Sequence, residues 1–246
     1  MQNKYVGDIG DYSKFVLIKH IFDGKCGLIW YLYPNENNSD GIHIEYDRYN
    51  LKDKEVTKLM KQVSEDKKVH ERNIKELEKV LSKDFNITFF NECIEEENCQ
   101  FFKDYKKRLS HRKEWFDRAL DKIHKCDVVF VDPDNGIQIK SCPTKGRKKS
   151  GKFIYFDEIN SILNQNKTLV IYQHLIRKKT DEFVKELKDR LRESLKNRNL
   201  NLTIIKFNRV SPRLYLIITK DNLDKKIQDF CNLFENEFTL IDKSNL

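Results

Sequence analysis

Apolar residues follow two different patterns along most of the chain, continuous runs and a spacing of three or four residues. Short continuous apolar runs rich in β-branched and aromatic residues predict strands, and such runs lie at 87–90, 127–131, 168–172, 202–207 and 213–219. Between these runs, apolar residues recur every three or four positions, which predicts helices, at about 99–124, 157–165, 179–196 and 222–236. Strands and helices are therefore expected to alternate.

The first third of the chain is more mixed. A glycine-containing acidic turn, Gly7–Asp11, leads into a predicted helix with Asp11 as its expected N-cap. An apolar run at 27–33 predicts a strand, and the segment 42–46 predicts a short extended piece. The densely charged stretch from about 52 to 84 has one apolar stripe, which predicts one long helix or two, packed on one face.

Strands that alternate with helices favour parallel βαβ units. We therefore expect a single α/β domain over residues 1–246, with three layers (α/β/α) and a mostly parallel central sheet. The strands at 202–207 and 213–219 are joined by a short turn, so they are expected to form an antiparallel hairpin at one edge of the sheet. The stretch at about 52–84 is expected to be a helical insertion in this domain.

The composition narrows the class of protein. With 39% apolar residues and a length of 246, the chain can build the core of one large domain. The net charge of +8 and the pI of about 9.0 favour a polyanionic partner such as nucleic acid. The six cysteines fall singly, without zinc-finger spacing, which is typical of a reduced cytoplasmic protein. No stretch approaches the roughly 20 apolar residues of a membrane span, so no membrane partner is expected.

The strongest chemical signal follows the predicted strand at 127–131. Asp132, Asp134 and Asn135 come directly after it, with a proline between the two carboxylates and a glycine after the carboxamide. Ligands of open α/β sheets bind in the crevice beyond the carboxyl ends of the strands, so these side chains are candidate catalytic residues. The alternative is a simple turn, because Asp, Asn, Pro and Gly are also the common turn residues.

Two other predicted strands lead to reactive side chains. The 27–33 strand is followed by Asp40 and His43, which are candidate substrate-binding residues, and the 168–172 strand by His174, a candidate catalytic residue. If these strands are neighbours of the 127–131 strand, the loops meet at one rim. Either histidine could instead be structural, His174 as a cap of the next helix. Tyrosines at the strand ends are candidate walls of a substrate pocket: Tyr31, Tyr33 and Tyr172.

The acidic turn at the start of the chain allows two interpretations. Asp8, Asp11, Tyr12 and Lys14 could take part in a site, since they combine carboxylates with an ammonium group. The turn could equally serve only to cap the following helix.

Basic residues gather beside the candidate catalytic segment. The loop at 140–152 carries six positive charges and no acidic residue, and a second basic run follows His174. Such runs could grip backbone phosphates on either side of a reacting nucleotide, although a solvated surface would look the same. The candidate phosphate-binding residues are Lys145, Arg147, Lys148, Lys149, Arg177 and Lys178.

Several segments resemble a family of prokaryotic proteins to which no activity is assigned. These segments lie between residue 4 and about residue 180: Val6–Lys14, Gly27–Pro34, Asp40–His43, Val129–Gly136 and Val170–His174. The segment Val129–Gly136 is also similar, more distantly, to the strand and turn of the uracil-DNA glycosylase superfamily, in which an Asp or Asn beside a proline orients the hydrolytic water. That resemblance implies that His174 matches the superfamily's histidine-bearing loop. The departures are that the turn comes late in the chain and that neither superfamily motif is matched in full.

The same turn resembles the Asp-Pro-Pro-Tyr motif of adenine-N6 methyltransferases, and the N-terminal helix is similar to that of members acting on ribosomal RNA. Here Asn135 stands in place of the aromatic residue that stacks on the base in that family. No glycine-rich loop follows the 27–33 strand, although a backbone that approaches a nucleoside cofactor needs glycine.

The sequence thus predicts a hydrolase acting on nucleic acid, with DNA as the expected form, that cleaves the N-glycosidic bond of a flipped base without a cofactor or metal. The alternatives are an S-adenosylmethionine-dependent methyltransferase, a Mg²⁺-dependent nuclease that uses the same carboxylates as ligands, and a non-catalytic nucleic-acid-binding module. The oligomeric state stays open.

Overall fold

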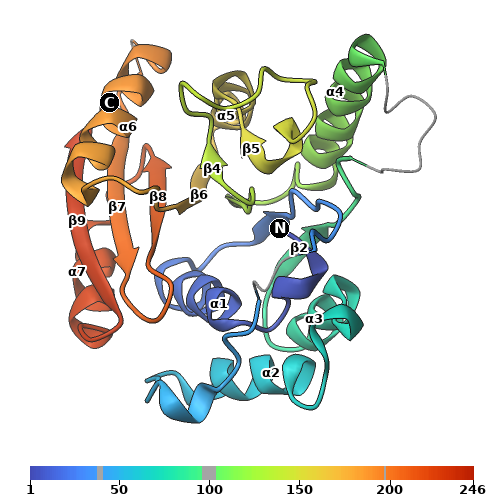
Figure 1. The fold of residues 1–246 in the computed structure, drawn as a ribbon. Helices are drawn as coiled ribbons and strands as arrows, with labels where there is room; N and C mark the ends of the chain where they lie inside the picture. Colours follow the sequence, from blue (N-terminus) through green and yellow to red (C-terminus); the bar gives the residue numbers. More distant parts are fainter. Residues whose placement is uncertain (38–40, 96–103, 197) are drawn as a thin grey trace.

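The computed structural model describes residues 1–37, 41–95, 104–196 and 198–246. A seven-stranded sheet with the order β2-β1-β3-β6-β8-β7-β9 forms its centre, and helices cover both faces (Figure 1). The strands of this sheet are β1 Cys26–Ile29, β2 Ile87–Phe90, β3 Val128–Val131, β6 Thr168–His174, β7 Asn201–Phe207, β8 Arg213–Thr219 and β9 Phe238–Asn245. Two short strands, β4 Gly136–Ile137 and β5 Phe153–Ile154, form a separate parallel pair. The predicted α/β class is confirmed.

Two apolar cores, one on each face of the sheet, produce the predicted three layers. Alternate residues of a strand enter different cores: Leu28 and Phe130 face one, Ile29 and Val131 the other. The first core is closed by α1 Ile9–Ile21, α2 Lys54–Ser64, α3 Ile74–Leu81 and α7 Asp224–Leu233. The second is closed by α4 Tyr105–Lys122, α5 Phe156–Leu163 and α6 Thr180–Ser194. The predicted helical stretch at 52–84 is the pair α2 and α3, between β1 and β2.

The strand order creates a single rim where several loops meet. β2, β1, β3 and β6 are parallel neighbours, so their carboxyl ends lie together. From β1 the chain crosses to β2 on one side and later returns to β3 on the other, and this reversal of direction is the usual ligand site of an open α/β sheet. The expectation that the strands leading to His43, Asp132 and His174 are neighbours is thereby confirmed.

The hairpin is antiparallel, as predicted, but it does not lie at the edge of the sheet. β8 pairs with both β6 and β7, and a strand that the pattern analysis missed, β9, covers the outer side of β7. The residues of β9 are mostly polar and partly exposed after Phe238, so they lack the apolar run used to recognise the other strands. Polar side chains are typical of edge strands because they discourage pairing with another chain.

Two local predictions were also wrong. The N-cap of α1 is Asp8 rather than Asp11, because the Asp8 side chain accepts hydrogen bonds from the second and third backbone amides of the helix. Asp11 lies in the first turn of the helix. β1 ends at Ile29, four residues earlier than predicted. The segment 42–46, expected to be a short extended piece, belongs to no strand.

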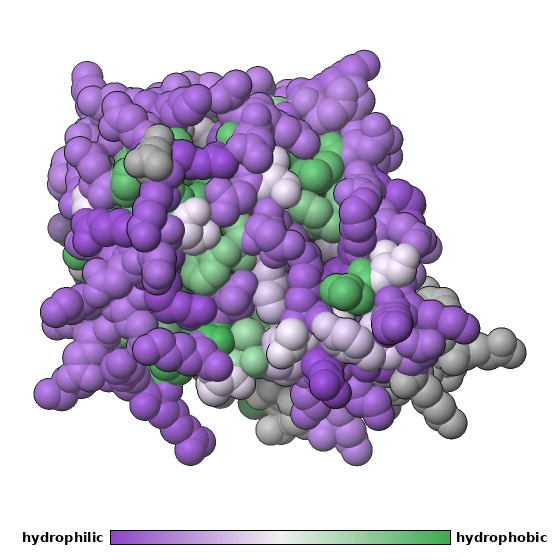
Figure 2. All heavy atoms as spheres, turned by 90° about the horizontal axis from the view of Figure 1, so that it is seen from above, coloured by the Kyte–Doolittle hydropathy of each residue, from purple (hydrophilic) through white to green (hydrophobic). Residues whose placement is uncertain are grey.

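Hydrophilic residues dominate the face of the molecule shown in Figure 2, and apolar residues appear there only as small areas interrupted by hydrophilic ones. Among the described residues, the most exposed large apolar side chains are Tyr105 and Leu109 on α4, Leu233 on α7, and Ile42 and Val210 outside the helices and strands. None of the described helices is long and apolar enough to span a bilayer.

Candidate functional site

A buried lysine links the N-terminal turn to the end of β3. The Lys14 ammonium group lies 2.8 Å from the Asp11 carboxylate and 2.7 Å from that of Asp132, and the Lys14 and Asp132 side chains are only 5% and 3% exposed. Burial lowers the pKa of Lys14, but the two carboxylates outweigh it and raise the pKa, so this lysine is charged. Lys14 therefore holds the Asp132 carboxylate in place at the rim.

The same arrangement raises the pKa of the Asp11 carboxyl group. Burial, opposed by Lys14 and reinforced by Asp8 and Asp132, raises the pKa of its carboxyl from 3.8 to about 6. Its second oxygen accepts a hydrogen bond from the Gly7 amide at 2.9 Å. The N-terminal turn is thus tied electrostatically to the β3 carboxylates.

Asp134 is the centre of a second charge cluster. Its carboxylate accepts a hydrogen bond from the Gln2 side chain at 2.7 Å and lies 3.3 Å from Lys152 and 3.4 Å from the Met1 ammonium group. Lys152 also pairs with Glu36. Burial alone would raise the pKa of Asp134. The two ammonium groups and the hydrogen bonds from Gln2 and Lys152 have a larger effect in the opposite direction, so the pKa lies below its usual value. Both carboxylate oxygens of Asp134 are occupied.

The turn after β3 is held by the buried side chain of Gln173. Its amide donates to the Asn135 carbonyl at 3.0 Å and accepts from the Ile137 amide at 2.8 Å. Gly136 has φ +95°, and a Cβ there would lie 2.4 Å from the Gln173 amide. The Asp-Pro-Asp-Asn-Gly segment is therefore a turn held in one conformation by Gln173, in agreement with the alternative that its residues form a turn. The fixed backbone also fixes the directions of the side chains in the turn.

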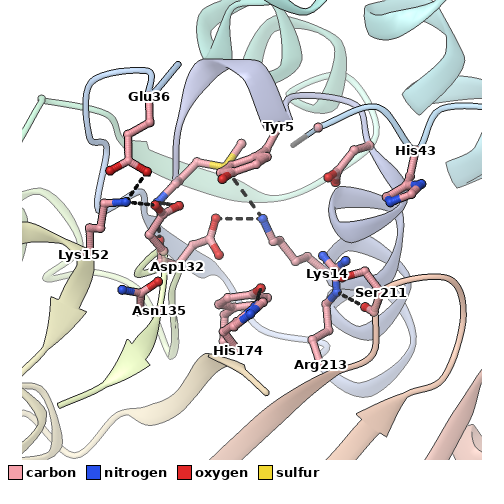
Figure 3. Close-up of a pocket in the computed structure, with 15 residues that line it drawn as sticks. Tyr5, Lys14, Glu36, His43, Asp132, Asn135, Lys152, His174, Ser211 and Arg213 are labelled. Carbon is pink, nitrogen blue, oxygen red and sulfur yellow. Dashed lines mark hydrogen bonds and ion pairs between the residues drawn. The ribbon is translucent and has the colours of Figure 1, made fainter. Parts of the chain in front are cut away.

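These clusters surround a cavity of about 320 Å³, within the usual range for small-molecule sites (Figure 3). Its walls come from the N-terminal turn, the chain after β1, and the ends of β3, β6 and β8. The lining residues are Met1, Tyr5, Asp8, Lys14, Glu36, Gly41, His43, Asp132, Asp134, Asn135, Lys152, Tyr172, His174, Ser211 and Arg213.

Two polar groups in this wall are open to a ligand. Asp132 uses one oxygen for Lys14, whereas its other oxygen accepts no hydrogen bond from the described residues. The side-chain amide of Asn135 likewise makes no hydrogen bond within the described part of the chain, and only its backbone is engaged. An ionised carboxylate oxygen beside a carboxamide can bind and polarise a water molecule.

Most of the residues predicted for catalysis and substrate binding meet in this cavity. All four candidate catalytic residues line it, as do His43 and Tyr172. Tyr31 lies in the second apolar core, which α4, α5 and α6 cover, and its hydroxyl donates a hydrogen bond to Glu158 at 3.3 Å. Tyr33 packs beneath Lys152 and does not line the cavity. Asp40 lies outside the described residues.

The predicted phosphate-binding residues lie elsewhere. Lys145 pairs with Glu158 at 3.2 Å, Arg147 stacks over the Tyr105 ring of α4, and Lys178 pairs with Glu186 at 3.0 Å. Exposed side chains complete the set: Lys148, Lys149 and Arg177. The basic loop thus leans on α4 and α5, and its only residue in the described cavity wall is Lys152.

Arg213 and Ser211 are cavity residues that sequence reasoning missed. β8 is antiparallel to β6, so its amino end reaches the rim formed by the carboxyl ends of the parallel strands, and Arg213 lies opposite His174 in the ladder. No signal in the sequence indicates that a residue preceding a strand belongs to the same rim.

No protein family, curated protein or solved structure matches this chain.

Proposed function

We propose that the cavity is the active site of a hydrolase that acts on nucleic acid and cleaves the N-glycosidic bond of a flipped nucleotide. The observation that carries the proposal is the state of Asp132: one oxygen is held by Lys14 at 2.7 Å, and the other opens onto the cavity. A buried carboxylate held in this way by an ammonium group can accept a proton from water and stabilise positive charge at the sugar carbon.

The surrounding side chains fit the remaining roles. In the proposed reaction the Asp132 oxygen takes a proton from water as the oxygen of that water bonds to the anomeric carbon. The bond from that carbon to the base nitrogen breaks, and the base leaves with its electron pair and gains a proton. Asn135 orients the water or the base, and His174, at the end of β6, assists departure of the base. Asp134 holds Lys152 and the N-terminal segment in place.

The alternative activities require different groups. For a metal-dependent nuclease, the two carboxylates would have to exchange Lys14 and Lys152 for a cation, and within the described ranges no cluster of His, Cys, Asp or Glu side chains is arranged to hold a metal. For a methyltransferase, the chain after β1 would have to accommodate a nucleoside cofactor, where buried Tyr31 and Tyr33 now stand.

One assay separates these activities. We expect incubation with single- and double-stranded DNA, with and without modified bases, to release free base and leave abasic sites, equally in the presence and absence of EDTA. Strand breaks that disappear in EDTA would instead establish a nuclease. Calorimetric binding of S-adenosylmethionine, with methyl transfer to the DNA, would establish a methyltransferase.

The basic loop offers a test of how the nucleic acid is gripped. Replacing Lys145, Arg147, Lys148 and Lys149 together with alanine is expected to weaken DNA binding about equally for all sequences and to reduce the salt dependence of the binding constant, because fewer counterions are released. Fluorescence anisotropy at several salt concentrations measures this slope. A variant altered at the exposed lysines of α7, Lys225 and Lys226, serves as the control. An unchanged slope in the loop variant would show that this loop does not contact phosphate.

A further inference from the structure

Arg213 is a buried arginine that forms no close ion pair with a described residue, although Asp8 and Asp11 lie near enough to interact with its charge. The residue is 7% exposed and lies in the cavity wall. Its Nε donates to the Ser211 carbonyl at 3.0 Å, and its guanidinium lies 5.8 Å from the centre of the Tyr172 ring. The two terminal nitrogens donate no hydrogen bond to any described residue, and no carboxylate of those residues is within ion-pair distance.

The other cations around the cavity differ from Arg213 in this respect. Lys14 is held between two carboxylates, and Lys152 pairs with Glu36 and Asp134. Burying a charge without a partner is costly, and buried charges in proteins are normally paired. Asp8 and Asp11 lie near Arg213 but accept no hydrogen bond from it, so its two terminal nitrogens are available to bind an anion in the cavity.

The fold keeps the guanidinium in this position from two sides. A Cβ at Gly10 would lie 1.8 Å from Nη1 of Arg213, so the guanidinium can occupy this position beside the first turn of α1 because residue 10 is glycine, and a larger residue would displace it. On the other side the Tyr172 ring supports it, and both are fixed by the β6–β8 ladder. Figure 3 shows Arg213 and Ser211 together on the β8 side of the cavity, next to Lys14.

We propose that Arg213 binds a phosphate group of the substrate and so makes the site selective for nucleotides over nucleosides. The guanidinium can hold two phosphate oxygens with parallel hydrogen bonds, a geometry that a lysine ammonium does not offer. The Ser211 hydroxyl, in the same wall, makes no hydrogen bond to a described residue and is a further donor for this phosphate. The inference deepens the proposed function and rests on it for the identity of the attached sugar and base.

The test is binding, measured by calorimetry and thermal shift with Asp132→Asn protein to prevent turnover. The probes are inorganic phosphate, the common 2′-deoxynucleosides, their 5′-monophosphates and short single-stranded oligonucleotides. We expect the monophosphate that binds best to bind about tenfold to a hundredfold more tightly than its nucleoside, in line with a charged hydrogen-bonded pair. Tighter binding of the oligonucleotide than of the monophosphate would identify a nucleic-acid strand as the source of the phosphate. Tighter binding of the monophosphate would identify a free nucleotide as the source.

Variants assign the effect to the guanidinium. Adding Arg213→Met or Arg213→Lys should abolish most of the phosphate preference while nucleoside affinity stays unchanged, and Gly10→Ala should do the same by displacing the guanidinium. Arg192→Met, which alters an exposed arginine of α6, should change nothing.

The outcomes separate the two proposals. Phosphate binding that depends on Arg213, without base release by the wild type, supports the phosphate site and refutes the glycosylase. Base release without any preference for phosphate, or a preference that survives all three variants, overturns the phosphate site. Failure of every probe to bind overturns it as well.

Discussion

Replacing Asp132 with asparagine is expected to slow base release about 10²- to 10⁴-fold, the usual cost of removing a general base. Asparagine has the same shape but cannot accept the proton from water, and it offers no negative charge to the developing cation. Lys14 keeps Asp11 as a partner at 2.8 Å, so the fold should survive. Single-turnover rates with oligonucleotide substrate measure the effect, and circular dichroism checks the fold.

The comparison with other aspartates makes this result specific. Asp134→Asn should reduce the rate less, because both of its oxygens bind protein groups and it acts by positioning them. Asp157→Asn, on the exposed side of α5, should leave the rate unchanged. Full activity of the Asp132→Asn protein would mean that the turn after β3 serves only the fold.

The second large effect is expected for stability. Lys14→Met removes the cation between Asp11 and Asp132 and leaves two buried carboxylates unpaired, which should lower the free energy of unfolding by about 3–5 kcal/mol. Lys19→Met is the matched control, since this lysine of the same helix is partly exposed and its ion pairs with Asp53 and Glu55 are worth about 1 kcal/mol or less. Urea denaturation measures both.

The loss caused by Lys14→Met should also depend on pH. In the wild type the pKa of Asp11 rises from 3.8 unfolded to about 6 folded, so its stabilising contribution is complete below about 3.8 and is lost as pH rises through about 6. Without Lys14 the pKa of Asp11 rises further, and the variant gains stability on acidification. The deficit should therefore be smaller at about pH 5 than at about pH 8. A deficit that is equal at both pH values would contradict this electrostatic account.

The elements with continuous apolar runs or with apolar residues at helical spacing could be predicted from the sequence, whereas β4, β5 and β9 could not. β3 and β6 are buried on both faces, and their runs of apolar residues have no competing interpretation. β9 was not predicted because a strand at the edge of a sheet needs little burial, so its residues follow no strong apolar pattern. The N-cap of α1 was misplaced because Asp8 and Asp11 are both suitable capping residues, and only the fold shows that Asp11 is needed by Lys14.

For the site, the sequence indicated the side chains that follow strands but not their partners. Asp132, Asn135 and His174 follow adjacent parallel strands, and general rules of α/β sheets bring such positions together. The pairing of Lys14 with Asp132 joins residues 118 positions apart and has no local signature. Arg213 depends on the direction of β8, which reverses the end of the strand that faces the cavity.

The hydroxyl groups of Ser13 and Tyr215, 202 positions apart in the chain, lie 2.5 Å from each other beside this cavity. Such a contact can form only after the chain between α1 and β8 has been brought into place, and contacts of high sequence separation form slowly because a long loop must close first. The cavity therefore cannot exist in a partly folded chain that lacks either end. The residues that line the cavity extend from Met1 to Arg213, so a bound ligand would stabilise distant parts of the chain together rather than one region of the protein.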